Sequence, residues 1–226
     1  PVLAPAGCQE LAELTFVAFD MADKYRNPVM LLGDGLMGQV MEPVIFPDFI
    51  DLKDLPEKDW VLNGCNGREP RAIFSMLLGQ GDLYTHNLDL QKKYDRITAE
   101  EQRWETQNTD DADIIVVAYG TAARIAESAM DELRTAGLKV GLFRPITLWP
   151  YPITTLRELA QNGRKIAVFE LCLGQMVEDV VLSVGERAEI YFYGVPGGNI
   201  PTPAEVADFL RSVAKGDGRV GRRIEV

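Results

Sequence analysis

The fold is decided by the stretch IIVVAYGTAARIAESAMDELRTAGLKVGLFRP, residues 114–145. An apolar run at 114–118 has the length of a buried strand, and a helix with one apolar face is predicted from 121 to 133. Gly137 stands where a helix end favours glycine, and a second apolar run follows at 140–143. This order predicts one βαβ unit with a right-handed crossover.

The same alternation continues toward the C-terminus. Helices are predicted at 155–160 and 176–184, and strands at 166–171 and 189–193. The run Thr202-Pro203-Ala204-Glu205 then combines an N-cap threonine, a first-turn proline and a capping-box glutamate. Four strands alternating with helices predict a mainly parallel open sheet with helices on both faces.

The upstream part of the chain predicts a second α/β unit. A helix is expected at 9–26, and an apolar strand buried on both faces at 29–32. The turn Gly33-Asp34-Gly35 ends that strand, and a short helix through Met41 is expected next. Prolines then mark a connector, which includes a charged helix expected at 90–107 to span domains or contact a partner. The predicted division is 1–50, the 51–110 connector, the 111–215 domain and a 216–226 tail.

Composition excludes several classes of protein. The 226 residues carry a formal net charge of −11, which disfavours binding to nucleic acid. No apolar run approaches the roughly 20 residues of a membrane helix, and no signal peptide is recognisable, so we expect a cytoplasmic location. Three widely spaced cysteines favour reduced thiols and provide no cluster of iron ligands. Any redox centre is therefore expected on another chain.

Four turns and loops are candidate ligand sites. Gly33-Asp34-Gly35 resembles the opening of a thiamine diphosphate signature, but Asn63 and Asn66 do not form its closing asparagine pair. A tight turn is the better interpretation, and no magnesium site is assigned. Gly120-Thr121 begins a helix where an anion can bind, although a simple helix start is favoured. Two further loops, 170–176 and 194–202, lie at strand ends and fit either a ligand or a partner chain.

The chain resembles the alpha subunits of 2-oxoacid:ferredoxin oxidoreductases. The resemblance rests on LAPAGCQE at 3–10, AFDMADKYRNPVMLLGDG at 18–35, VAYGTAARIAESA at 117–129 and KVGLFRPITLWPYP at 139–152. It extends to the residues near Gly174 and 197–203. It implies part of a thiamine pyrimidine-type α/β domain, followed by a domain similar to the C-terminal domain of transketolase. The branched-chain 2-ketoisovalerate enzyme is the most similar type, and the 2-oxoglutarate enzyme is next.

The resemblance implies oxidative decarboxylation of a 2-oxoacid with coenzyme A, which yields acyl-CoA and reduced ferredoxin. Thiamine diphosphate and Mg²⁺ would be shared with a beta subunit, and iron–sulfur clusters would lie on other subunits. The family's Tyr-Pro-Ile-Thr-Pro motif and its activating glutamate have no counterpart here, and the chain opens on Pro1 without Met. We therefore expect an N-terminally truncated piece that is inactive alone, binds no cofactor alone, and holds no catalytic or metal-binding residue.

The candidate residues follow from these patterns. Gly33, Asp34 and Gly35 are expected to border the thiamine pocket. Interface or ligand-loop candidates are Arg144, Thr147, Trp149, Gly174, Gln175, Met176, Gly197, Gly198 and Asn199. Two other hypotheses stay open: a non-catalytic α/β assembly module that only binds partner subunits, and a stand-alone transketolase-like or dehydrogenase enzyme. The last lacks a complete diphosphate site and a GxGxxG motif.

Overall fold

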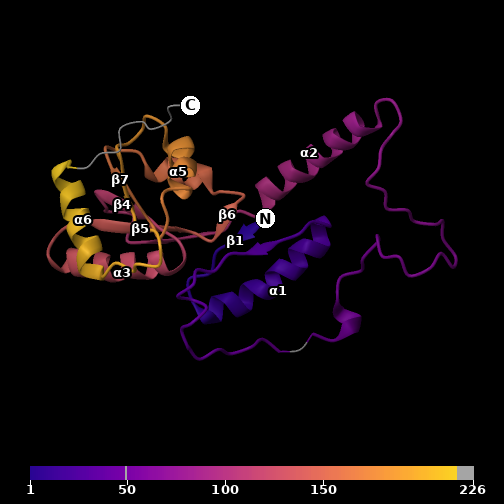
Figure 1. The fold of residues 1–226 in the computed structure, drawn as a ribbon, viewed down its shortest axis with the longest axis horizontal. Helices are drawn as coiled ribbons and strands as arrows, with labels where there is room; N and C mark the ends of the chain where they lie inside the picture. The colour runs from indigo at the N-terminus through magenta and orange to yellow at the C-terminus, as the bar shows by residue number, and fades with distance from the viewer. Residues whose placement is uncertain (49, 218–226) are drawn as a thin grey trace.

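The computed structural model describes residues 1–48 and 50–217 (Figure 1). From residue 218 on, the predicted tail lies outside the described residues. Two sheets and the helices packed on them form the body of the protein. A long segment between them extends to one side. Among the described residues, no helix combines the length and apolar character needed to cross a bilayer.

The larger sheet has five strands in the order β3-β5-β4-β7-β8. Its strands are β3 (Trp104–Gln107), β4 (Ile114–Val117), β5 (Val140–Pro145), β7 (Lys165–Glu170) and β8 (Ile190–Gly194). β4, β5, β7 and β8 run parallel, as the alternating pattern predicted. All four residues of β4 are buried, because helices cover both faces of the sheet.

Helices lie on both faces of this sheet. One face carries α3 (Gly120–Thr135) and α6 (Pro203–Lys215), which pack against each other. The other carries α4 (Ile153–Leu159) and α5 (Met176–Val184). The predicted capping box of α6 is present: Thr202 Oγ1 accepts from the Glu205 amide, and Glu205 accepts from the Thr202 amide. The helices predicted in this region are therefore confirmed, within two residues at each end.

The smaller sheet joins the first segment to the larger domain. Its order is β2-β1-β6, formed by β1 (Val2–Leu3), β2 (Met30–Leu31) and β6 (Thr147–Trp149). β1 pairs parallel with β2 and antiparallel with β6, and α1 (Cys8–Tyr25) packs on this sheet through Leu14, Ala18 and Met21. Because β6 directly follows β5, the two parts of the protein share backbone hydrogen bonds.

Two predictions in the first segment were wrong. Residues 29–32 were expected to form a strand buried on both faces, but only Met30–Leu31 pair, and the Met30 side chain is 55% exposed. The reason is that β2 is the edge of a three-stranded sheet. The short helix expected through Met41 is a hydrogen-bonded turn over 35–39 instead. Asp34 caps its start by accepting the Leu36 and Met37 amides, but the turn ends before Val40 and does not continue as a helix.

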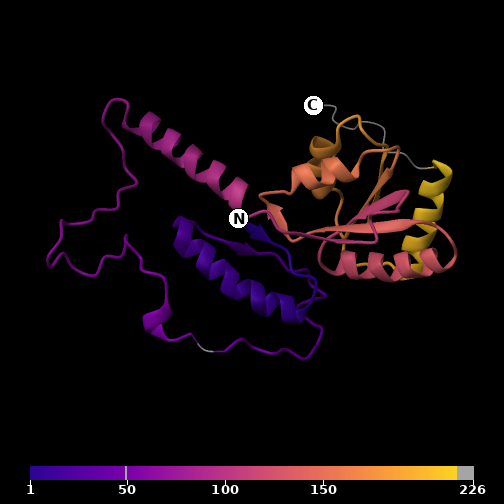
Figure 2. The same ribbon diagram turned by 180° about the vertical axis from the view of Figure 1, so that it is seen from behind.

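The charged helix also differs from its prediction. The helix α2 spans Asp82–Glu100, and residues 104–107 form β3, antiparallel to β5. Charge pairing along the sequence did not reveal this boundary, because β3 is set by backbone pairing with β5 and by the Glu105–Arg144 ion pair. Upstream, the described residues 40–48 and 50–80 contain turns at 59–60 and 66–67 and no helix or strand apart from the short 3₁₀ turn η1 (Leu52–Asp54). Figure 2 shows from behind that this segment and α2 stand away from the larger sheet.

Candidate functional site

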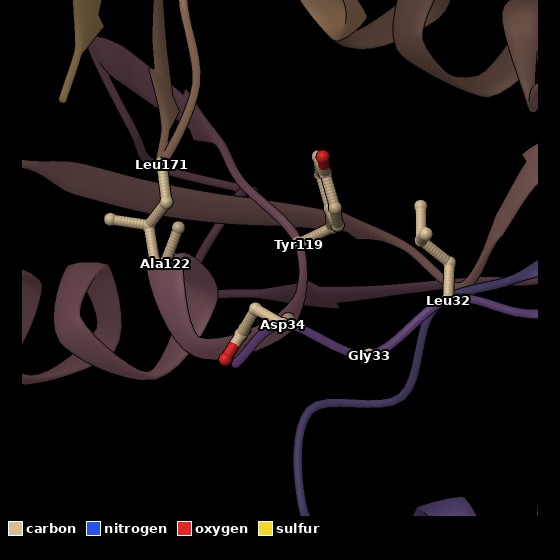
Figure 3. Close-up of a pocket in the computed structure, with 7 residues that line it drawn as sticks. Leu32, Gly33, Asp34, Tyr119, Ala122 and Leu171 are labelled. Carbon is tan, nitrogen blue, oxygen red and sulfur yellow. The ribbon is translucent and has the colours of Figure 1, made fainter. Parts of the chain in front are cut away.

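The larger sheet has a topological switch point between β4 and β7. From β4 the chain crosses through α3 to β5, whereas from β7 it crosses through α5 to β8 on the opposite side. Ligands of open α/β sheets bind beyond the carboxyl ends of strands at such a point. A cavity of about 160 Å³ lies there (Figure 3), lined by Leu32, Gly33, Asp34, Tyr119, Gly120, Ala122 and Leu171.

Asp34 closes one side of this cavity by capping α3. Its Oδ2 accepts from the Thr121 amide at 2.9 Å, and its Oδ1 accepts from the Thr121 hydroxyl at 2.9 Å. Tyr119, the N-cap residue of α3, makes no side-chain cap of its own. A residue 87 positions upstream therefore satisfies an amide in the first turn of α3.

The Asp34 carboxylate also shapes its own turn, since its Oδ1 accepts from the amides of Leu36 and Met37 at 3.1 and 2.9 Å. Burial alone would raise the pKa of Asp34, but the donors from Met37 and Thr121 outweigh burial and lower that pKa. Gly120 adopts φ +59° and a Cβ there would lie 3.1 Å from Asp34 Oδ2, so glycine permits this close approach.

A second carboxylate caps the helix that follows the neighbouring strand. Glu170, fully buried at the end of β7, accepts from the amides of Met176 at 3.0 Å and Val177 at 2.9 Å. The Cys172 thiol donates to Glu170 Oε2 at 2.9 Å. Burial, and next the bond to Glu170, raise the pKa of Cys172, which holds the sulfur as a thiol and disfavours a nucleophilic role.

The caps formed by Asp34 and Glu170 limit which ligands this chain can bind at the switch point. Free helix N-termini attract phosphate groups, but the chain's own carboxylates already occupy those of α3 and α5. Both oxygens of Asp34 accept hydrogen bonds from the protein, Oδ1 from the Met37 amide and Oδ2 from the Thr121 amide. The residues present therefore do not fit a diphosphate with its Mg²⁺. Among the described residues, no group of three or more His, Cys, Asp or Glu side chains could hold a metal ion.

Tyr119 gives the cavity an apolar wall with a neutral hydroxyl. Burial raises the pKa of Tyr119 to about 12, helped by the negative charges of Glu170, Asp34 and the Cys172 thiolate that forms at high pH. Its hydroxyl points away from Asp34 in Figure 3. With Leu32 and Leu171, it suits the flat face of an uncharged ring more than a charged group.

Arg144, Thr147 and Trp149 lie where the first segment meets the larger domain. Arg144, 8% exposed, binds Glu10 of α1 at 2.9 and 3.0 Å and Glu105 of β3 at 2.6 and 3.0 Å.

The other two residues of this group make local contacts. Thr147 is fully buried, and its hydroxyl accepts from the Arg103 amide at 2.9 Å. Trp149 makes an edge-to-face contact with Tyr94 of α2, with ring centroids 5.9 Å apart. All three residues thus hold segments of the same chain together.

The remaining candidates lie in two separate loops. Gly174, at φ +108°, packs so closely that a Cβ would lie 3.0 Å from Val177 and 3.1 Å from Phe192. Met176 is buried in the first turn of α5, and Gln175 before it is exposed. Gly197, Gly198 and Asn199 are exposed before α6, and the two glycines have φ +77° and +80°. None of these residues lines the Asp34 cavity.

Sequence analysis missed the partners that build the site. Thr121 was considered only as part of a helix start, and Glu10 was not named at all. No local pattern points to either one, because their partners Asp34 and Arg144 lie 87 and 134 positions away. Glu170 had a detectable pattern, since a carboxylate at a strand end shortly before a helix suits a cap.

The sequence is similar to subunits of known oxidoreductases. Residues 112–206 match the family model "Pyruvate:ferredoxin oxidoreductase core domain II". The chain is 40% identical to the ketoisovalerate oxidoreductase subunit VorB of Methanothermobacter thermautotrophicus, over 94% of this chain and 60% of that protein. It is 30% identical to the 2-oxoglutarate synthase subunit KorA of Methanothermobacter marburgensis, over 90% of this chain and 61% of that protein. The chain thus spans about 60% of the length of these curated relatives.

A solved structure has the same fold. It is 2-oxoglutarate:ferredoxin oxidoreductase from Magnetococcus marinus with 2-oxoglutarate, coenzyme A and succinyl-CoA bound. The likeness has a TM-score of 0.69 at 18% identity and covers 93% of this chain and 41% of that one. At this identity it bears on the fold alone, and it confirms the predicted α/β fold across both parts of the protein.

Proposed function

Because the chain belongs to the family of 2-oxoacid:ferredoxin oxidoreductase subunits, we propose that it is the alpha-type subunit of such a complex. The complex would oxidatively decarboxylate a 2-oxoacid to acyl-CoA, with ferredoxin as the electron acceptor. The observation that carries the proposal is the 40% identity to a ketoisovalerate oxidoreductase subunit over 94% of the chain. We propose ketoisovalerate as the substrate. The second candidate is 2-oxoglutarate, because identity to the 2-oxoglutarate synthase subunit is lower, at 30%.

Thiamine diphosphate would supply the carbanion-stabilising chemistry of this reaction. We infer that another subunit holds its diphosphate and Mg²⁺, because Asp34 and Glu170 already occupy the helix ends of this chain. This chain would then form one side of the cofactor pocket. Gly33 and Asp34 line the cavity, with Tyr119 on its apolar side, whereas Gly35 follows them in the sequence but is not among the lining residues. Iron–sulfur clusters would lie on other subunits. The loops 174–176 and 197–199 would contact ligand or partner.

The test is reconstitution with a beta subunit. The co-purified complex should reduce a viologen dye only when ketoisovalerate, coenzyme A and thiamine diphosphate are all present. Ketoisovalerate should give a higher kcat/KM than 2-oxoglutarate. A complex that forms but reduces no dye with any branched-chain or dicarboxylic 2-oxoacid would refute the proposed activity.

The isolated chain provides the control. We expect it to show no turnover and no tight binding of thiamine diphosphate with Mg²⁺ by isothermal titration calorimetry. Sub-micromolar binding by this chain alone would contradict the assignment of the diphosphate to another subunit.

A further inference from the structure

Residues 41–88, here called the arm, leave the body of the protein after α1 and return along α2 (Figures 1 and 2). The arm is anchored at its start, where Ile45 exchanges two hydrogen bonds with the Gln9 side chain at 2.8 and 2.9 Å. It is held again at Lys58, which pairs with Asp23 of α1. The arm therefore leaves the body from fixed points.

Within the part of the chain that the structure describes, residues 61–80 make no hydrogen bond or ion pair to the body of the protein. Every hydrogen bond found for residues 61–80 stays within the segment 58–82, as when Arg68 and Arg71 donate to the Val61 carbonyl at 3.3 and 2.9 Å. These bonds keep the chain in a loop, but they bury little of it. The loop and the first turns of α2 project away from both sheets in both ribbon views.

The arm exposes more apolar surface than is usual for a segment surrounded only by solvent. Thirteen large apolar side chains between Met41 and Leu88 are exposed, among them Phe74 at 74%, Met76 at 72% and Leu78 at 84%. At roughly 100 Å² each, they present on the order of 1,000 Å². A typical monomer's largest apolar patch covers about 300–600 Å², and a standard interface buries about 800 Å² per partner. The arm is thus large enough to form a stable interface.

The charge of the chain indicates whether a second copy or a different protein binds the arm. A second copy would bring another net charge of −11 against this one. The arm holds eight Asp and Glu residues against four Lys and Arg residues, so its formal charge is −4, although Arg68 and Arg71 lie near Phe74 in the sequence. The exposed Asp54, Glu57 and Asp59 have no ion-pair partner in the described chain. A favourable partner has an apolar surface with basic residues at its edge.

We propose that the arm wraps around a different subunit of the complex, one with an apolar surface edged by lysine or arginine. This inference rests on the proposed function, because the relatives of this chain are named as subunits of oxidoreductases. The interface would cover residues 61–80, and the contacts of Ile45 and Lys58 with α1 would set its position.

The test compares the wild-type complex with arm variants. Phe74→Asp combined with Leu78→Asp places two charges in the apolar surface, while both sites are exposed in this chain. The matched control is Leu182→Asp on α5, where the side chain is 69% exposed but lies outside the arm. We expect the arm variant to raise the subunit dissociation constant about tenfold or more, as for residues central to an interface, and the control to change it less than about twofold.

Cys65 provides a readout that needs no substitution, because it is exposed in the middle of the arm. Maleimide labelling of Cys65 should be at least about tenfold slower in the complex than in the isolated chain, if a partner covers the arm. A cysteine placed at the exposed position 182 on α5 (Leu182→Cys), outside the arm, serves as the comparison in a second sample.

Each outcome bears on one proposal. Weaker association of the arm variant, with slow Cys65 labelling in the wild-type complex, supports the arm interface. Unchanged association in a complex that retains 2-oxoacid-dependent activity overturns the arm interface and leaves the proposed function standing. An isolated chain that dimerises in sedimentation experiments, and loses the dimer on arm substitution, assigns the arm to a second copy. A wild-type complex that forms without activity refutes the proposed function alone.

Discussion

Replacing Arg144 with alanine should loosen the first segment from the larger domain. Arg144 is the central residue of the joint, with α1 on one side through Glu10 and β3 on the other through Glu105. Its side chain is 10% exposed, compared with 22% for Glu10 and 43% for Glu105. Burial, which disfavours the charged form, is outweighed by the bonds to Glu10 and Glu105, so the pKa of Arg144 is raised and the guanidinium stays charged.

The magnitude follows from these exposures. Removing one partner of a fully buried ion pair costs about 3–5 kcal/mol, because the other charge is left without compensation. Glu105 is partly solvated, and a screened pair contributes about 1 kcal/mol or less. We therefore expect Arg144→Ala to cost about 2–4 kcal/mol, Glu10→Gln about 1–2 and Glu105→Gln less than about 1. Arg144→Lys keeps the charge but loses the two-pronged geometry, so it should cost about 1–2 kcal/mol.

Hydrogen exchange of the α1 amides measures the opening of this joint directly, and urea denaturation followed by circular dichroism measures global stability. The α1 amides should lose protection in Arg144→Ala, while those of α6, remote from the joint, keep it unless the whole domain unfolds. A cost below about 1 kcal/mol for Arg144→Ala would refute the reasoning. A stability loss for Glu105→Gln equal to that for Arg144→Ala would also refute it. Solvent exposure would then not explain why the Arg144–Glu105 pair contributes less than the Arg144–Glu10 pair.

Three further predictions concern single groups. Asp34→Ala should cost about 1–2 kcal/mol by uncapping Thr121. Since the folded pKa of Asp34 is lowered, this contribution is present above the unfolded pKa of about 3.9 and is lost as pH falls through the folded value. A urea-measured gap to wild type that stays constant from pH 7 to pH 3 would contradict this. Tyr151→Phe should leave stability unchanged or raise it by about 1 kcal/mol, because the buried Tyr151 hydroxyl has no hydrogen-bond partner among the described residues; a lower melting temperature would contradict the idea. In the isolated chain at pH 7.5, iodoacetamide should alkylate Cys172 more slowly than Cys65, because burial and then Glu170 raise the pKa of Cys172; equal rates in peptide mass spectrometry would argue against it.

Much of the larger domain could be predicted because its elements are locally encoded. The helix and strand order after residue 111 follows from apolar periodicity within windows of about a dozen residues. The α6 start needed only Thr202, Pro203 and Glu205, and all three act as expected. The elements that failed were those whose state depends on a distant neighbour. β3 is a strand because β5 pairs with it, and β2 is exposed because it lies at a sheet edge.

The sequence by itself determined the α/β class, the resemblance to 2-oxoacid:ferredoxin oxidoreductase subunits and the turn that follows Gly33. Only the tertiary structure showed that this turn caps α3 through Asp34, that Glu10 meets Arg144, and that the arm stands apart. The physical reason is range. Periodicity and capping act among residues within one or two helical turns, whereas a carboxylate finds a donor 87 or 134 positions away only after the strands have paired and the helices have packed.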